Sequence, residues 1–209
     1  MAAGELMPGP TMGSDASVGV PHWLAWCRHL VAVTVGLPEL LLDAGGLLQR
    51  LGAAGVQIDV LVAAENEEQA DDAAAVALSE LNIADITRHR LALPAPFGVE
   101  RVDDLVAAMS ELVGFDPDPG VFCLAPVTEG RQPCQVTVGA AADVIADVYG
   151  LPVVRYSETA DESGADVELS DDEWTRKCSS LTACATAVLP LSGHREHFTV
   201  RSAGARATR

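Results

Sequence analysis

The chain has 209 residues, of which 13 are Lys or Arg and 30 are Asp or Glu, so its formal net charge at neutral pH is −17. Such a charge repels nucleic-acid phosphates and anionic lipid surfaces, and we therefore expect neither nucleic acid nor a membrane as a partner. A hydrophobic content of 49% is sufficient to fill the core of one α/β domain of this length.

Composition divides the chain into three parts. Residues 1–20 are rich in Gly, Pro, Ser and Met and lack the pattern of a signal peptide, which predicts a flexible tail. Residues 21–200 are expected to form one domain, and the basic residues 201–209 a second flexible tail. No apolar run approaches the roughly 18 residues that span a bilayer. Because the five cysteines are scattered and form no Cys-x-x-Cys pair, we expect neither a disulfide framework nor a structural zinc site, and a cytoplasmic location.

The ordered part begins with two tryptophans and a strand–helix–strand pattern. Trp23 and Trp26 are spaced to lie on one side of a short helix packed against the core or a neighbouring subunit. Two nearly continuous apolar runs, Leu30–Val35 and Val56–Ala63, predict buried strands, with a turn at 36–39 and an amphipathic helix between them. This pattern is typical of a βαβ unit with a parallel sheet.

Ligands of such sheets bind outside the carboxyl ends of the strands. Gly36–Asp43 follows the first predicted strand, and Ala64–Glu68 follows the second. These two segments are therefore expected to face the functional crevice.

The rest of the chain alternates between helical and extended patterns. We expect an edge strand at Ile86–Leu93, ended by prolines, and exposed loops at Pro126–Gln135 and Glu158–Asp172, with Val167 and Leu169 able to pair at an edge. The remaining predicted helices are Glu65–Leu81, Val99–Val113, Val136–Tyr149 and Trp174–Val188, and the remaining strands are Val121–Ala125, Leu151–Tyr156 and Phe198–Val200.

Two short motifs follow predicted strands. Gly36-Leu37-Pro38-Glu39-Leu40 precedes Gly45-Gly46, and Gln132-Pro133-Cys134-Gln135 precedes Val138-Gly139. Their order and spacing resemble the two signatures of the LmbE-like, or PIG-L (GlcNAc-PI de-N-acetylase), family of zinc-dependent N-deacetylases, over about Leu30–Phe198. The resemblance implies a three-layer, Rossmann-like α/β fold, with a mostly parallel sheet and helices on both faces.

The first signature of that family is His-Pro-Asp-Asp-Glu. Its His and second Asp bind zinc, and its first Asp is the general base. In this chain the resemblance places Gly36 and Glu39 at the two ligand positions and Pro38 at the position of the base.

The second signature is His-Pro-Asp-His. Its last His completes the zinc site, and its first His is usually assigned to transition-state stabilisation or proton delivery. Gln135 and Gln132 stand at these positions, with Cys134 in place of the Asp. Near the end, Lys177 and Glu196-His197-Phe198 match structural positions of the family.

These replacements argue against the family's catalysis. Catalytic zinc takes three protein ligands drawn from His, Asp, Glu or Cys, and a neutral glutamine oxygen replaces imidazole poorly. A site of Gly36, Glu39 and Gln135 is predicted to lose the zinc. We therefore expect a non-catalytic pseudoenzyme that binds a small molecule or an active homologous subunit, with Gly36, Glu39, Gln132 and Gln135 as the ligand-binding residues.

Three alternatives stay open at this point. One is an amide hydrolase with a rebuilt active site in the same crevice, using Glu39 or Cys134, although Cys134 has no histidine nearby in sequence and Glu39 is ordinary as a helix N-terminal acid. Another is a zinc deacetylase that draws a ligand from His89 or His197. A homo-oligomer is the third open point, since the sequence does not decide the oligomeric state.

Overall fold

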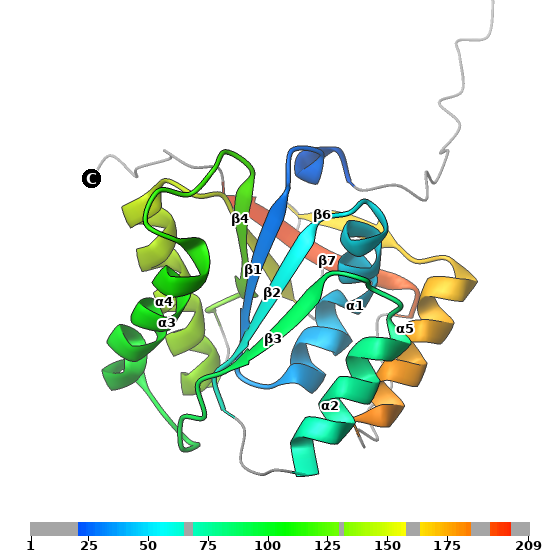
Figure 1. Cartoon of the computed structure of the whole chain (residues 1–209), viewed down its shortest axis with the longest axis horizontal. Coiled ribbons are helices and arrows are strands. Elements are labelled where there is room, and N and C mark those ends of the chain that lie inside the picture. The colour runs from blue at the N-terminus through cyan, green and yellow to red at the C-terminus, as the bar shows by residue number, and fades with distance from the viewer. Residues whose placement is uncertain (1–20, 65–68, 130–131, 158–163, 185–192, 202–209) are drawn as a thin grey trace, which may run out of the picture.

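The computed structural model describes residues 21–64, 69–129, 132–157, 164–184 and 193–201. Seven strands are present in these ranges: β1 (His29–Thr34), β2 (Gln57–Val62), β3 (Ile86–Arg90), β4 (Val121–Pro126), β5 (Val153–Ser157), β6 (Ala165–Glu168) and β7 (Arg195–Arg201). The helices are α1 (Leu37–Ala53), α2 (Gln69–Glu80), α3 (Val102–Val113), α4 (Pro133–Tyr149) and α5 (Asp171–Ala183), with short 3₁₀ turns η1 (His22–Leu24) and η2 (Val99–Arg101) (Figure 1).

The strands form one mixed, mostly parallel sheet. Its order is β3-β2-β1-β4-β5-β7-β6, and β3, β2, β1, β4 and β5 run parallel to one another. β7 is antiparallel to both β5 and β6. The central strand β1 places Leu30 opposite Ile58 of β2 and Phe122 of β4, so β1 is covered by a neighbour on each side.

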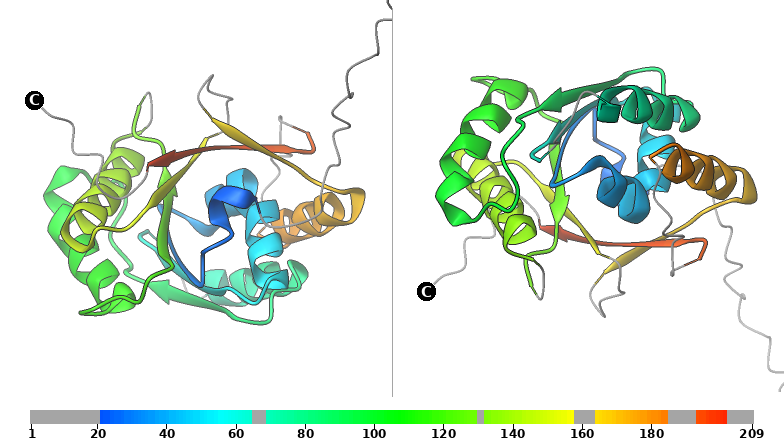
Figure 2. Two further views of the ribbon diagram at one scale, coloured as in Figure 1. Left: turned by 90° about the horizontal axis from the view of Figure 1, so that it is seen from above. Right: turned by 90° about the horizontal axis from the view of Figure 1, so that it is seen from below.

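Helices cover both faces of the sheet. Alternate side chains of the strands point to opposite faces, which produces two separate hydrophobic clusters. One cluster lies beneath α1, α2 and α5, and the other beneath α3 and α4 (Figure 2). This arrangement is the three-layer, Rossmann-like fold that the sequence predicts.

Three helices begin earlier than predicted. α5 starts at Asp171 and not at Trp174, because Ser170 caps it and ends the predicted loop sooner. The other two have a proline in their first turn. α1 starts at Leu37, so Pro38 and Glu39 belong to its first turn and not to a separate turn at 36–39. α4 starts at Pro133, whereas the prediction left residues up to Gln135 in a loop. Both errors have the same cause: proline is well tolerated in the first helical turn, where its missing N–H needs no partner.

The prediction that Trp23 and Trp26 lie on one packed face is wrong. Trp23 packs against the core, with its ring centroid 5.9 Å from that of Phe198 in β7. The side chain of Trp26 is 81% exposed, because it lies in the turn after η1 and not in a longer helix.

β3 is an edge strand of the sheet as predicted, and Val167 pairs at the other edge within β6. Predictions for residues 1–20, 65–68, 185–188 and 202–209 lie outside the described residues. Among the described residues, no helix is both long enough and apolar enough to cross a membrane.

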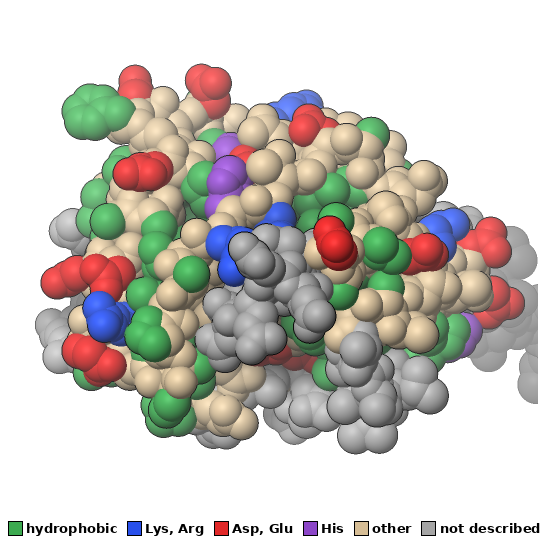
Figure 3. Space-filling model, turned by 60° about the horizontal axis from the view of Figure 1, so that its bottom comes forward, with side chains coloured by type: hydrophobic (Ala, Val, Ile, Leu, Met, Phe, Trp, Pro, Cys, Tyr) green, Lys and Arg blue, Asp and Glu red, His purple; other side chains and the backbone are tan. Residues whose placement is uncertain are grey.

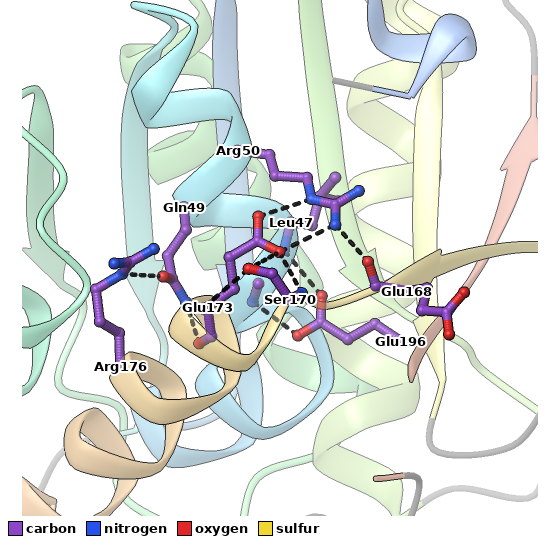
Figure 4. A network of polar contacts seen from close by, with 9 residues as sticks. Leu47, Gln49, Arg50, Glu168, Ser170, Glu173, Arg176 and Glu196 are labelled. Carbon is purple, nitrogen blue, oxygen red and sulfur yellow. Dashed lines mark hydrogen bonds and ion pairs between the residues drawn. The ribbon is translucent and has the colours of Figure 1, made fainter. Parts of the chain in front are cut away.

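A buried polar network joins α1 to β7 and α5. The backbone N–H groups of Gly46 and Leu47 donate to the two carboxylate oxygens of Glu196, at 2.7 and 2.8 Å (Figure 4). Lys177 of α5 donates to the same carboxylate at 2.6 Å, and both charged side chains are completely buried. A Cβ atom on Gly46 would lie 2.1 Å from Leu169, so only glycine fits there. The Gly45-Gly46 motif therefore has a structural reason to be present.

Candidate functional site

The segments that the two motifs predict lie together at one end of the sheet. α1 begins directly after β1, and α4 begins a short loop after β4. β1 and β4 are adjacent parallel strands, and their helices cover opposite faces, which is the switch point at which open α/β sheets bind ligands. Figure 3 shows this end of the molecule turned toward the viewer, with acidic side chains spread over its surface. The segments 36–39 and 132–135 therefore lie on neighbouring elements, as the predicted crevice requires.

The start of α1 provides one wall of this crevice. Gly36 is the N-cap residue, with an extended backbone (φ −143°, ψ 149°), and its carbonyl accepts a hydrogen bond from Thr34 Oγ1 at 2.9 Å. Glu39 is half-buried in the first turn, where its carboxylate lies near the positive end of the helix dipole.

Tyr156 of β5 lies beside Glu39. Its side chain is completely buried, and its hydroxyl lies 3.5 Å from Glu39 Oε1. Burial raises the pKa of Tyr156 well above its ordinary value, and the nearby carboxylates of Glu39 and Asp43 raise it further. The Tyr156 hydroxyl therefore stays protonated and can act as a hydrogen-bond donor.

The start of α4 provides the facing wall, and its glutamines cap the helix. Gln132 is the N-cap residue and Gln135 the third helical residue of a capping box. The side-chain oxygen of Gln135 accepts a hydrogen bond from the backbone N–H of Gln132 at 3.1 Å. Both predicted ligand-binding glutamines thus have a structural task at the helix end.

Cys134 lies between them but shows no sign of activation. It is half-buried and packs against the hydrophobic cluster beneath α4. A nucleophilic thiol requires a neighbouring base or a positive field. Within the part of the chain that is described, no such group contacts the Cys134 thiol, so packing is the role that the structure supports.

The histidines that could have supplied a ligand are bonded elsewhere. His89 Nε2 lies 2.7 Å from Asp59, and His197 Nδ1 lies 2.7 Å from Asp166. His194 stacks on Trp174, so the pair His194 and His197 is not directed at a common point. Over the described ranges, no three His, Cys, Asp or Glu side chains are placed to hold one metal ion.

Sequence reasoning overlooked Thr34 and Tyr156, which hydrogen-bond to Gly36 and Glu39 of the first motif. Both are completely buried and polar, and both lie near the carboxyl ends of parallel strands. That position is the signal that could have identified them, because the carboxyl ends of neighbouring parallel strands meet at one edge.

Comparisons with known proteins identify solved structures that have a similar fold. No family model and no curated protein matches the sequence. Among solved structures, a triple mutant of a deacetylase of the teicoplanin biosynthetic pathway superposes with a TM-score of 0.64 at 13% identity, over 85% of this chain and 100% of that one. The A40926 pseudoaglycone deacetylase superposes with a TM-score of 0.61 at 18% identity, over 86% of this chain and 99% of that one. The chain has the LmbE-like deacetylase fold.

This fold does not by itself decide the reaction. The 4-carboxy-2-hydroxymuconate hydratase of Pseudomonas putida also superposes, with a TM-score of 0.55 at 11% identity, over 87% of this chain and 98% of that one. Since a hydratase and deacetylases share the LmbE-like fold, function has to be argued from the side chains of the crevice.

Proposed function

We propose that this chain is a pseudoenzyme of the LmbE-like fold: it binds a small molecule in the crevice at the carboxyl ends of β1, β4 and β5, without zinc-dependent deacetylation. The proposal rests on the residues that stand at the three zinc-ligand positions of the family. Gly36 offers no side chain, and the Gln135 oxygen is engaged in capping α4. Glu39 is the one remaining zinc-ligand type among the three positions, and three protein ligands are the norm for catalytic zinc.

Two glycines of the motifs, Gly46 and Gly139, are present in this chain. Close packing around them explains their presence, so they are no evidence for catalysis. Leu169 packs directly against Gly46, and the backbone N–H of Gly46 donates to Glu196. A Cβ atom on Gly139 would lie 2.4 Å from Thr128, and the Gly139 carbonyl accepts a hydrogen bond from Arg155 at 3.0 Å. The glycines of the motifs are therefore needed for packing whether or not the site is catalytic.

The crevice retains groups that suit recognition. Glu39 supplies a half-buried carboxylate that accepts a hydrogen bond from the completely buried hydroxyl of Tyr156, and α1 and α4 direct their N-termini to the same edge of the sheet. A few fixed polar groups at such an edge are typical of small-molecule sites. Binding without turnover is the function that this arrangement supports best.

A gain-of-metal experiment tests the proposal. The purified chain is expected to hold no stoichiometric zinc after dialysis and to hydrolyse no N-acetyl amino sugar in added zinc. The double variant Gly36→His with Gln135→His should acquire zinc, because two imidazoles would join Glu39. Position 36 has room, since an added Cβ would meet only Pro38 Cδ at 3.8 Å. Metal content by mass spectrometry is the readout.

The matched control is Gly36→Ala with Gln135→Ala, which removes the same cap without adding ligands. Tight zinc or amide hydrolysis by the unaltered chain would overturn the proposal. Zinc uptake by the alanine variant equal to that of the histidine variant would show that the ion binds somewhere else.

A further inference from the structure

A second hollow lies along α5, and it shares no residue with the crevice. Its volume is about 580 Å³, and it is lined by Glu80 at the end of α2 and by Trp174, Thr175, Cys178, Ser179, Thr182 and Ala183 of α5. α2 and α5 lie side by side, and Ser180 Oγ donates to the Ala77 carbonyl at 2.6 Å (Figure 1). Small-molecule sites have volumes of roughly 300–1,000 Å³.

The polar lining of this hollow contains the Glu80 carboxylate and three hydroxyls, of Thr175, Ser179 and Thr182. Thr175 Oγ1 already donates to the Asp171 carbonyl at 2.7 Å, and Thr182 Oγ1 donates to the Cys178 carbonyl at 2.8 Å. These hydroxyls therefore have only lone pairs left to offer. Glu80 adds an exposed carboxylate. Glu80 and the two threonine oxygens can therefore be paired only by donors that a ligand brings.

No cationic side chain lines the hollow, although Arg176 and Lys177 belong to the same helix. Arg176 Nε donates to Gln49 at 2.7 Å on the side of α5 that faces α1 (Figure 4). Lys177 is buried against Glu196. Glu80 therefore has no competing cation among the residues that line the hollow.

The apolar part of the lining is rigid. Trp174 is held in place by stacking on His194, with ring centroids 4.8 Å apart and an interplanar angle of 22°. Ala183 lies further along the same helix. An indole ring and a methyl group offer apolar surface that a hydrocarbon chain can contact in place of water.

We propose that this hollow binds an alkylammonium ion. The alkyl chain packs against Trp174, and the ammonium group donates to the Glu80 carboxylate. The net charge of −17 raises the local concentration of cations around the whole chain. This site goes beyond the proposed function of the crevice and does not depend on it.

Three probes with the same hydrocarbon chain test the chemical class. Pentylammonium, pentanol and pentanoate differ only in the head group, and each is titrated into the full chain by calorimetry and tryptophan fluorescence. We expect saturable one-to-one binding of pentylammonium, weaker binding of pentanol and none of pentanoate. Equal binding of pentylammonium and pentanol would overturn the assignment of a cation site, and absence of saturation would overturn the site itself.

Paired variants separate this site from diffuse attraction to an acidic protein. Glu80→Gln should weaken pentylammonium binding by roughly three- to fivefold, the loss expected of an exposed ion pair. Glu111→Gln removes the same charge from the exposed surface of α3 and should leave the affinity unchanged. Ser179→Arg places a cation in the hollow and should abolish binding, with an unchanged unfolding midpoint as evidence of folding. Equal losses in Glu80→Gln and Glu111→Gln, or full binding by Ser179→Arg, would contradict the proposal.

Discussion

Lys177 and Glu196 carry opposite charges in a completely buried part of the molecule. Removal of water from two charges is expensive, and only good geometry with further hydrogen bonds offsets this cost. Glu196 meets that condition through the backbone N–H groups of Gly46 and Leu47, as well as through Lys177. The carboxylate thus fixes the position of α1, whose first turn carries Glu39.

Loss of one partner should be severe. We expect Lys177→Met to lower the free energy of unfolding by about 3–5 kcal/mol, because it leaves the Glu196 charge buried without its cation. Arg101→Ala is a control, since its ion pair with Asp104 is exposed and should contribute under about 1 kcal/mol. Urea unfolding measures both. Similar small losses in the two variants would contradict this account of the buried pair.

Neighbouring glycines at positions 45 and 46 should respond differently to alanine. A Cβ on Gly46 would lie 2.1 Å from Leu169 Cδ2, so Gly46→Ala should destabilise the protein by about 1–3 kcal/mol. A Cβ on Gly45 would meet Lys177 Cγ at 3.4 Å, an ordinary contact. Alanine there should be neutral or stabilising by up to about 1 kcal/mol, because it favours the helix. Thermal unfolding of the two variants checks the contrast, and equal shifts would refute it.

At the scale of secondary-structure elements, one carboxylate ties three adjacent strands together. Asp59 of β2 lies 2.7 Å from His29 of β1 and 2.7 Å from His89 of β3, and it also accepts a hydrogen bond from Gln57 at 3.0 Å. Burial by itself raises the pKa of Asp59, but the hydrogen bonds from His89, His29 and Gln57 together lower it below its ordinary value. The ionised carboxylate therefore stabilises this edge of the sheet.

The sign of this shift gives a pH prediction. Because the pKa is lower in the folded chain, the stabilisation is complete above the unfolded value of about 3.9 and is lost as the pH falls through the folded value. Asp59→Asn should lower the free energy of unfolding by about 1–2 kcal/mol at neutral pH. The difference between this variant and the unaltered chain should shrink below about pH 4. Urea unfolding from pH 3 to 7 tests this, and a constant difference would count against it.

At the scale of the whole molecule, the net charge of −17 has a general consequence. Like charges repel more strongly in the compact state than in the unfolded chain, and salt screens this repulsion. We expect the midpoint of thermal unfolding to rise when sodium chloride increases from about 0.01 to 0.15 M, as the screening length falls from roughly 30 to 8 Å. Calorimetry in a salt series measures it. A falling midpoint would mean that ion pairs such as Arg50–Glu173 outweigh the repulsion.

Much of the fold could be predicted from the sequence because periodicity is a local property. Apolar runs identified β1, β2, β4 and β5, and the helical pattern between β1 and β2 predicted their parallel pairing. The crevice position followed from the order of strands and helices, since ligand sites in such sheets lie at the carboxyl ends. The two motifs lie at the starts of α1 and α4, which follow the adjacent strands β1 and β4, and their role in ligand binding stays a prediction.

Tertiary structure decided what depends on residues far apart in the chain. The contact between Gly46 and Glu196 joins positions 150 residues apart, and no local pattern encodes it. The extension of α4 back to Pro133 turned Gln132 and Gln135 from loop residues into a helix cap, and Tyr156 reached Glu39 only through the packing of β5 beside β4. The sequence by itself determined the elements and their order, because hydrophobic spacing acts over one or two turns. Only the folded chain could decide which polar groups meet, because such meetings depend on topology and burial.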